Sequence, residues 1–330
     1  MCNAAGVIAL GWATPAGIVA GYLADVLFAD PRRGHPVAGF GWCATALEKI
    51  TYRDDRGSGV IHTAVLVGSM VGAGVLAQRR AGGGAEVLLT AAATWVTLGG
   101  TTLGKTGAAM ADRVAHEDVD GARALLPSLC GRDPAVLDGP GLTRAACESV
   151  AENTADATVA PLMWVALAGV PGVLAYRAIN TLDAMIGNRS ARYLRFGWAA
   201  ARLDDLVNII PARVTGLLVA LCAPLVGGSP TGAVRAWSRD ADRHPSPNAG
   251  VVEAAFAGAL DVQLGGPTPY RHELEIRPTL GEGRPPGVED LRRAVRLSRW
   301  VPLAAAVLAA ARALAISAVG HSGRSVSPQR

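Results

Sequence analysis

Long apolar runs dominate the chain and set its predicted class. Uncharged stretches of about 20 residues, the length a helix needs to cross a bilayer, occur at Ala4–Ala24, Gly57–Ala77, Val87–Gly104, Ala157–Tyr176 and Val214–Val234. A soluble chain of 330 residues has too little polar surface to cover five such helices. The pattern therefore predicts an all-α, multi-pass integral membrane protein with loop-rich cytoplasmic segments.

The order of these runs predicts one membrane-embedded domain over residues 1–330. Its three parts are N-terminal spans at 1–104, a cytoplasm-facing catalytic region at 105–300 and a C-terminal apolar helix at 301–320. The N-terminal spans are expected at roughly 5–24, 58–77 and 87–104, and the stretch 235–300 is expected to be loop-rich. Because a charge at mid-bilayer is costly, Arg312 in the last helix must face protein, snorkel or lie in a helix that does not fully cross.

The two middle runs, 157–176 and 214–234, lie between polar clusters of the catalytic region. If each run crossed the bilayer once, those clusters would be divided between its two sides, and one site could not assemble. Pro161, Gly169 and Pro171 also weaken a straight helix in the first run. We therefore expect both runs to be buried or re-entrant helices, with every polar cluster open to the cytoplasm.

Charge and cysteine content narrow the function classes. The 31 basic and 27 acidic residues leave a net charge of +4, which gives no electrostatic footprint for nucleic acid. The five cysteines are scattered and predict neither a disulfide framework nor a zinc site. Arg32 and Arg33 follow the first run, and the positive-inside rule puts the N-terminus outside and that loop in the cytoplasm. The expected location is the cell's inner membrane.

Two polar clusters precede the middle runs. Arg32 and His35 crowd one turn after the first span and are candidate ligands for a phosphate or carboxylate; the alternative is a juxtamembrane anchor. Glu148, Glu152 and Asp156 recur every four residues on one helical face, and such like charges favour a bound Mg²⁺. The alternative for these acids is a solvated helical face.

Two more clusters lie between and after the middle runs. The first offers polar stripes on apolar helices, with Arg177, Asn180 and Asp183 in one half and Arg202, Asp204, Asp205, Asn208 and Arg213 in the other. Carboxylates in such surroundings bind a metal or form buried ion pairs between helices. Ser246 and Asn248 cap a small-residue helix, whose N-terminus can bind an anion or simply be capped.

The segment Gly99–Thr106 matches the phosphate-loop pattern letter by letter. That pattern works between a buried strand and a helix, whereas this segment ends an apolar run suited to a membrane span. We expect no nucleotide site here, and expect Lys105 to anchor the end of a span.

In these clusters the chain resembles the CobD/CbiB family, the adenosylcobinamide-phosphate synthases of cobalamin biosynthesis. The resembling segments run in family order at Asp30–Val37, Gly131–Asp133, Glu148–Asp156, Tyr176–Gly187, Ala201–Arg213 and Ser246–Gly250. The resemblance implies ATP-dependent condensation of adenosylcobyric acid, through a propionate carboxyl, with (R)-1-amino-2-propanol or its O-phosphate. Neither the true acceptor nor the oligomeric state follows from it.

Activating a carboxylate with ATP and Mg²⁺ needs acids for the metal, cations for the phosphoryl group and a base for the amine. By residue type, the metal ligands are Glu152, Asp156, Asp204 and Asp205, and the amine base is Asp183 or Glu148. The remaining candidates bind substrate or phosphate, and they are Arg32, His35, Asn153, Arg177, Asn180, Arg202, Asn208, Arg213, Ser246 and Asn248.

Two other functions fit parts of the pattern. A Mg²⁺-dependent intramembrane prenyltransferase would use Asn180, Asp183, Asp204 and Asp205, but it needs two similar acidic motifs. A corrinoid or cation transporter would line its path with intramembrane carboxylates, but it predicts inverted repeats that the sequence does not display.

Overall fold

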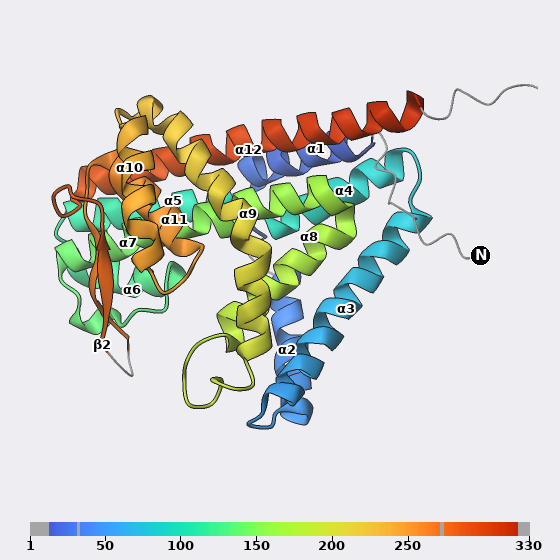
Figure 1. The fold of residues 1–330 in the computed structure, drawn as a ribbon, viewed down its shortest axis with the longest axis horizontal. Helices are drawn as coiled ribbons and strands as arrows, with labels where there is room; N and C mark the ends of the chain where they lie inside the picture. Colours follow the sequence, from blue (N-terminus) through green and yellow to red (C-terminus); the bar gives the residue numbers. More distant parts are fainter. Residues whose placement is uncertain (1–12, 32–33, 271–273, 323–330) are drawn as a thin grey trace, which may run out of the picture. The chain divides into compact units, whose positions relative to one another are not determined.

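The structure is a computed structural model that describes residues 13–31, 34–270 and 274–322. Helices make up most of it (Figure 1). They are α1 (Ala13–Phe28), α2 (Pro36–Thr51), α3 (Arg56–Arg80), α4 (Gly84–Thr97), α5 (Gly100–Ala115), α6 (Val119–Leu125), α7 (Gly139–Thr154), α8 (Ala160–Ile186), α9 (Trp198–Cys222), α10 (Pro230–Asp240), α11 (Ala249–Leu260) and α12 (Val288–Ser322). Strands β1 (Leu264–Pro269) and β2 (Leu274–Leu280) form an antiparallel hairpin.

The predicted fold class is confirmed. Within the described residues, five helical segments are long and apolar enough to cross a membrane, as in a multi-pass membrane protein. They are Arg56–Arg80, Gly84–Ala115, Gly139–Ile186, Trp198–Val226 and Val288–Ile316.

The chain divides into two compact units. Unit 1 comprises Met1–Leu98, Ala160–Leu206 and Ala305–Arg330, and unit 2 comprises Gly99–Val159 and Val207–Ala304. Helices α9 and α12 contribute residues to both units. The prediction of one membrane-embedded domain remains a prediction.

Side chains placed just ahead of the helices determine where several of them begin. Asp55 accepts a hydrogen bond from the Ser58 amide at 2.8 Å and caps α3. Asp138 and Ser229 cap α7 and α10 in the same way, each with a proline in the first helical turn. Such caps satisfy amides that have no partner inside the helix, and proline loses nothing at that position.

In unit 1, α1 lies along α4 at very close range. Gly17 and Gly21 of α1 face Thr90 and Thr94 of α4, and a Cβ atom built on either glycine would lie 2.5 Å from the Cβ of the opposing threonine. The spacing of four residues puts both glycines on one face, the small-residue pattern of packed membrane helices. Any larger side chain at these positions would push the helices apart.

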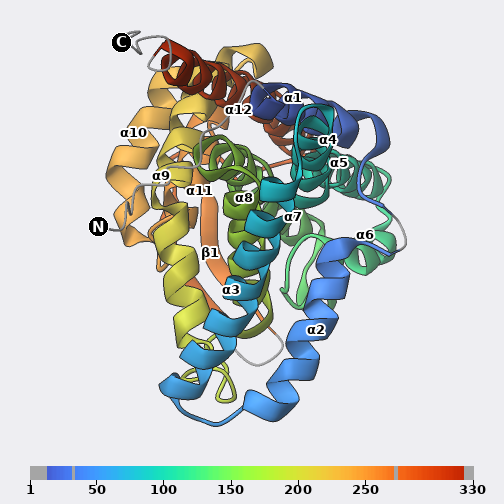
Figure 2. The same cartoon turned by 90° about the vertical axis from the view of Figure 1, so that its right-hand side faces the viewer.

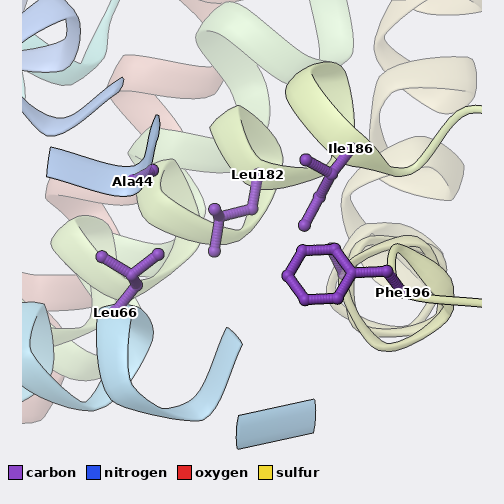
Figure 3. Packing of buried hydrophobic residues seen from close by; sticks show 6 residues of the cluster. Ala44, Leu66, Leu182, Ile186 and Phe196 are labelled. Carbon is purple, nitrogen blue, oxygen red and sulfur yellow. The ribbon is translucent and has the colours of Figure 1, made fainter. Parts of the chain in front are cut away.

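Helix α8 is central to the packing of unit 1, because it contacts α1, α2, α3 and α4. Figure 2 shows α2 and α3 joined by a short connection at 52–55. Leu182 and Ile186 of α8 meet Phe196 (Figure 3). The rest of this hydrophobic cluster is Ala44 of α2, Leu66 of α3 and Ala200 of α9. This contact anchors the C-terminal half of α8, which carries the polar stripe described below.

A break inside α8 explains the charged residue in the last apolar helix. Ala168 and Gly169 leave helical geometry, with a φ of +63° at Gly169, and Pro171 follows. Carbonyl groups in the preceding turn lose their helical partners at such a break. Arg312 of α12 donates from Nη1 to the carbonyl oxygen of Ala166 at 2.7 Å. Arg312 is an exposed residue whose guanidinium nevertheless binds protein, in line with one of the expected solutions, and the first middle run is a broken helix.

Unit 2 is built around α7, α11 and the hairpin. Helix α11 is almost wholly buried, and it packs against α7, α10 and both strands. Leu264 pairs with Leu280 at one end of the hairpin, and a bulge follows at Gly265, whose φ is +82°. The bulge turns the amide of Gly265 away from the strand ladder.

Several predicted boundaries are wrong. The span at 87–104 breaks at Leu98 and Gly99, where two successive glycines weaken a helix, and α5 continues to Ala115. The run at 214–234 is not one helix, because Gly227 adopts a left-handed conformation and α10 starts afresh at Pro230. The stretch 235–300 is far more ordered than expected, since it holds α11, the hairpin and the start of α12.

Two sequence expectations concern the N-terminal part and the phosphate-loop match. Residues 1–12 lie outside the described residues, and α1 runs on to Phe28, four residues beyond the predicted end of the first span. The segment Gly100–Thr106 lies in α5 and follows helix α4 rather than a strand. The strand that the phosphate-loop pattern requires before its loop is therefore replaced by a helix here.

We predict that Arg312→Leu lowers stability by about 1–3 kcal/mol, because a carbonyl at the helix break loses a charged donor. Thermal unfolding in detergent measures this, and Arg312→Lys is expected to retain part of the effect. Arg296→Leu on the same helix is the control, since it removes only an exposed ion pair with Glu289 worth about 0–1 kcal/mol. Equal stability of the two leucine variants would contradict the capping role.

Candidate functional site

A buried ion pair lies at the centre of unit 2. Glu148 of α7 is 1% exposed, and its Oε2 accepts a hydrogen bond from Nη2 of buried Arg132. Its Oε1 accepts from the Gly265 amide of β1 at 2.7 Å. The carboxylate thus joins α7, the loop before α7 and the hairpin. Burial alone lowers the pKa of Arg132, but Glu148 raises it and the net shift is upward.

A second buried carboxylate stands beside this pair. Glu253 of α11 is 1% exposed, and its Oε1 lies 3.8 Å from Nε2 of His244. Burial, and then repulsion from Glu148 and Glu152, raise the pKa of Glu253 well above its usual value, although Arg277 and Arg132 oppose them. Burial, and then Arg277, lower the pKa of His244, so the imidazole is neutral at physiological pH.

The hairpin supplies two more polar groups to this unit. Arg277 of β2 donates to the Tyr270 hydroxyl at 2.7 Å and to Glu275 at 3.2 Å. Burial lowers the pKa of Arg277, but Tyr270 and Glu253 raise it, and the net shift is upward. The combined set of Glu148, Glu253, Arg132, Arg277 and His244 is called the buried cluster below.

Helix α7 passes into a π-helical turn at Ala155–Val159, which contains Asp156. Such turns insert an extra residue into the helix and recur at functional sites. Asp156 therefore leaves the regular four-residue spacing expected from the sequence. Asn153, one turn earlier, donates to the Ser149 carbonyl at 2.9 Å.

In unit 1 the polar stripes of α8 and α9 meet. Arg177 donates to Oδ1 of Asn180, and Nδ2 of Asn180 donates to Oδ1 of Asp204, each at 3.4 Å. Asp183 follows Asn180 by one turn on α8 and is half-buried. Arg177 also lines a small apolar cavity of about 50 Å³ with Phe40 and Thr181. A guanidinium, an amide and a carboxylate from two helices thus form one chain of contacts.

Other predicted residues of the two units have more local roles. Arg202 pairs with Asp205 one turn away at 3.2 Å, with both side chains partly exposed. His35 caps α2 by accepting from the Val37 amide at 3.1 Å, and its other ring nitrogen lies 3.6 Å from Asp30. Arg32 lies outside the described residues.

In unit 2, the start of α11 is held by predicted residues. Oγ of Ser246 accepts from the Ala249 amide at 3.2 Å, which is the cap expected there. Arg213 of α9 donates to Oδ1 of Asn248 at 2.8 Å, and Asn208 on the same helix is buried. These contacts tie α9 to the N-terminus of α11.

The predicted site residues fall into two groups. Unit 1 brings together Arg177, Asn180 and Asp204, and it also holds His35, Asp183, Arg202 and Asp205; unit 2 holds Glu148, Glu152, Asn153, Asp156, Asn208, Arg213, Ser246 and Asn248. Among the described residues, no three His, Cys, Asp or Glu side chains come together in a way that could hold a metal ion. The Mg²⁺ site and the single shared pocket remain predictions.

Sequence reasoning missed Glu253, His244 and Arg277, and it gave Arg132 no role. One signal was present for Glu253, which is the only charged residue in the apolar segment Ala249–Leu260. A lone carboxylate in such a helix is costly and calls for an explanation. His244, Arg277 and Arg132 carry no such local signal, because their partners are distant in sequence.

These features define a class of protein first: a multi-pass helical membrane protein with charged clusters buried inside its units. The family model described as CobD/Cbib protein matches residues 18–298. The chain therefore belongs to the CobD/CbiB family.

Curated relatives agree with this assignment. The chain is 67% identical over 299 residues to the cobalamin biosynthesis protein CobD of Mycobacterium tuberculosis H37Rv, which covers 90% of this chain and 96% of that protein. It is 44% identical over 272 residues to the protein of that name from Geobacter metallireducens, covering 80% of this chain and 86% of the relative. No solved structure was found to match the chain.

We predict that Glu148→Gln lowers stability by about 3–5 kcal/mol, because Arg132 then stays buried without its hydrogen-bonded counter-charge. Thermal unfolding in detergent measures the loss. The double variant Arg132→Met with Glu148→Gln is expected to be more stable than Glu148→Gln alone, since it removes the uncompensated charge. A single variant as stable as wild type would show that the pair does not hold unit 2 together.

Proposed function

We propose that the protein is an ATP-dependent amide ligase of cobalamin biosynthesis. It joins a propionate carboxyl of adenosylcobyric acid to (R)-1-amino-2-propanol or its O-phosphate, at the inner membrane with its clusters open to the cytoplasm. The observation that carries the proposal is the chain of contacts from Arg177 through Asn180 to Asp204. It joins residues of two segments through which the sequence resembles this family. The names of the curated relatives support the pathway.

The proposed chemistry has two steps. In the first, an oxygen of the propionate attacks the γ-phosphorus of ATP, the bond from that phosphorus to the β-bridging oxygen breaks, and ADP leaves. In the second, the amine nitrogen attacks the acyl carbon and inorganic phosphate leaves. Both steps place negative charge on phosphate oxygens, so cations and Mg²⁺ are the stabilising groups expected.

The residues of unit 1 suit the first step. Arg177 and Arg202 would hold the phosphoryl group or propionate, since a guanidinium matches both geometries. Asp204 and Asp205 would contact Mg²⁺, with Asn180 orienting an oxygen beside them. Asp183, one turn from Asn180, remains a candidate base.

The residues of unit 2 divide between binding and positioning. Glu152 and Asp156 remain candidate Mg²⁺ ligands, Arg213 a candidate phosphate ligand, and Asn153, Asn208 and Asn248 orienting amides. Glu148 accepts from Arg132 and from Gly265, and a carboxylate so engaged is better suited to position those groups than to accept a proton. We therefore assign Glu148 a positioning role within the proposal.

The donor set fits a metal that arrives with its nucleotide. Mg²⁺ bound to ATP takes most of its ligands from phosphate oxygens and water and needs only one or two carboxylates. Asp204 beside the Asn180 amide supplies such a partial set. A free Mg²⁺ held entirely by protein would need a larger cage.

Purified protein in lipid nanodiscs, supplied with adenosylcobyric acid and Mg²⁺·ATP, is expected to form an amide with one of the two amine acceptors. Mass spectrometry would detect a product equal to the two substrates less one water, together with ADP, and omission of ATP should abolish it. Uptake of the corrinoid into liposomes without ATP or amide formation would instead indicate a transporter.

Asp205→Asn is expected to abolish turnover while leaving membrane insertion and folding intact. Folding should survive because the ion pair of Asp205 with Arg202 is partly exposed, and such pairs contribute about 0–1 kcal/mol. The matched control is Asp120→Asn, which removes a similar one-turn pair with Arg123 at 3.3 Å and should leave turnover unchanged. Wild-type activity in Asp205→Asn would remove this residue from the site.

A further inference from the structure

Unit 1 carries a strongly basic surface at the end where α2 meets α3. Figures 1 and 2 both show the loop 187–197, which joins α8 to α9, beside the short connection between α2 and α3. Segments 48–56 and 187–197 hold three acids and six exposed cations, which leaves a net charge of +3. The cations, called the basic patch below, are Lys49, Arg53, Arg56, Arg189, Arg192 and Arg195.

Contacts inside unit 1 hold the loop 187–197 against the start of α3. The Tyr52 hydroxyl donates to the carbonyl oxygen of Arg192 at 3.1 Å. The guanidinium of Arg192 lies over the Tyr52 ring and donates to Oε1 of Glu48 at 2.8 Å. Gly59 of α3 lies so close to the carbonyl of Phe196 that a side chain at this position would clash. Arg192 therefore fixes the loop, and its charge is paired with a carboxylate of the same unit.

The other five cations of the basic patch differ from Arg192. Among the described residues, none of the five forms an ion pair with a carboxylate. Asp55 lies close to them in sequence, but its two oxygens accept from the amide and the hydroxyl of Ser58, as a cap of α3. Arg56 stacks on the ring of Trp198, and a stacked guanidinium keeps its N–H donors at its edge. The patch thus presents positive charge that the described part of the fold does not neutralise.

The membrane spans indicate what covers the basic patch. Helices α3 and α9 belong to two candidate spans that begin at Arg56 and Trp198, and the guanidinium carbon of Arg56 lies 5.2 Å from the centre of the Trp198 ring. Arginine and tryptophan are typical of the membrane–water interface. Large apolar side chains stand between the cations, with Ile50 82% exposed and Leu194 59% exposed. A soluble anion needs no such neighbours, whereas a lipid offers an anionic headgroup and apolar chains together.

We infer that the basic patch binds the headgroups of acidic phospholipids and anchors this end of unit 1 at the membrane surface. The phosphate oxygens of the lipid accept from the guanidinium groups of Arg189 and Arg195, since the two geometries match. Ile50 and Leu194 contact the upper parts of the acyl chains. The segment 48–56 is expected on the cytoplasmic side, where the membrane surface is negative. This inference concerns lipid alone and does not depend on the ligase proposal.

The test measures lipid binding by the whole protein in phosphatidylcholine vesicles. A small fraction of the lipid is replaced by phosphatidylglycerol or phosphatidylcholine with brominated acyl chains, which quench tryptophan fluorescence on contact. Trp198 is a reporter inside the region of interest. Wild type should be quenched at a lower fraction of the brominated phosphatidylglycerol. Raising NaCl to about 1 M, where the screening length is about 3 Å, should remove most of this preference.

The double variant Arg189→Gln with Arg195→Gln removes two charges of the loop and no ion pair with a carboxylate. It should therefore melt at the wild-type temperature in detergent. Its preference for phosphatidylglycerol should fall about tenfold or more, because each arginine near an acidic surface contributes about fivefold in affinity. The variant Arg189→Lys with Arg195→Lys keeps both charges and should keep most of the preference. A glutamine variant with the wild-type preference would overturn the inference.

Arg292→Gln with Arg296→Gln is the control of equal charge. Both arginines are exposed, but they pair with Asp112 and Glu289, so their charge is already compensated. This control should retain the wild-type preference for phosphatidylglycerol. A loss as large as that of the loop variant would assign the effect to the net charge of the protein and overturn the inference. Equal quenching of wild type by the two brominated lipids would overturn it as well.

Two soluble anions separate a lipid site from a site for a free anion. Glycerol 3-phosphate carries the headgroup phosphate without acyl chains, and ATP carries more negative charge. Neither should displace the brominated phosphatidylglycerol from wild type when added in excess, and displacement by either would overturn the inference. If the glutamine variant melts below wild type, the salt dependence of wild type decides instead. A preference for phosphatidylglycerol that persists unchanged at about 1 M NaCl would then overturn the inference.

Discussion

The Glu148 carboxylate is the contact on which unit 2 depends. One of its oxygens accepts from Arg132 and the other from the Gly265 amide, so three segments of the chain meet at a single buried group. Taking two charges out of water costs several kcal/mol per ion, and the cost is met only when each lone pair finds a donor. The bulge at Gly265 provides the second donor, because its left-handed backbone turns the amide toward α7. The buried carboxylate of Glu148 therefore links the hairpin to α7, and it would lack its second hydrogen-bond donor if the hairpin were absent.

The same constraint acts on the backbone in unit 1. A break at Ala168 and Gly169 frees carbonyl groups inside an apolar helix, where no water replaces the lost partners. The guanidinium of Arg312 donates a hydrogen bond to one of these carbonyls. The charge of Arg312 therefore caps the first half of α8. Helices α1 and α4 are held together in a different way. Gly17 and Gly21 let the two backbones approach closely, so these apolar helices pack through van der Waals contact.

Sequence reasoning succeeded where the signal is local. Hydrophobic run length predicted the helical membrane class, and Gly169 and Pro171 predicted a broken helix. It failed where an apolar run continues past the end of a helix, as at Leu98 and at Gly227. Hydrophobicity alone does not show where the backbone leaves helical geometry. The contact between Gly265 and Glu148 spans 117 residues, and no pattern within one helix can reveal it.

The buried carboxylates of unit 2 differ in whether their oxygens have hydrogen-bond donors. A carboxylate that already accepts from arginine and backbone donors, as Glu148 and Asp240 do, has little acceptor capacity left for a substrate. Glu253 combines equal burial with free acceptor capacity and a neutral imidazole neighbour. Burial, and then repulsion from Glu148 and Glu152, accordingly raise the pKa of Glu253 well above its usual value. Within one buried cluster, the fold thus fixes the carboxylate of Glu148 as a structural link and leaves that of Glu253 without a hydrogen-bond partner among the described residues.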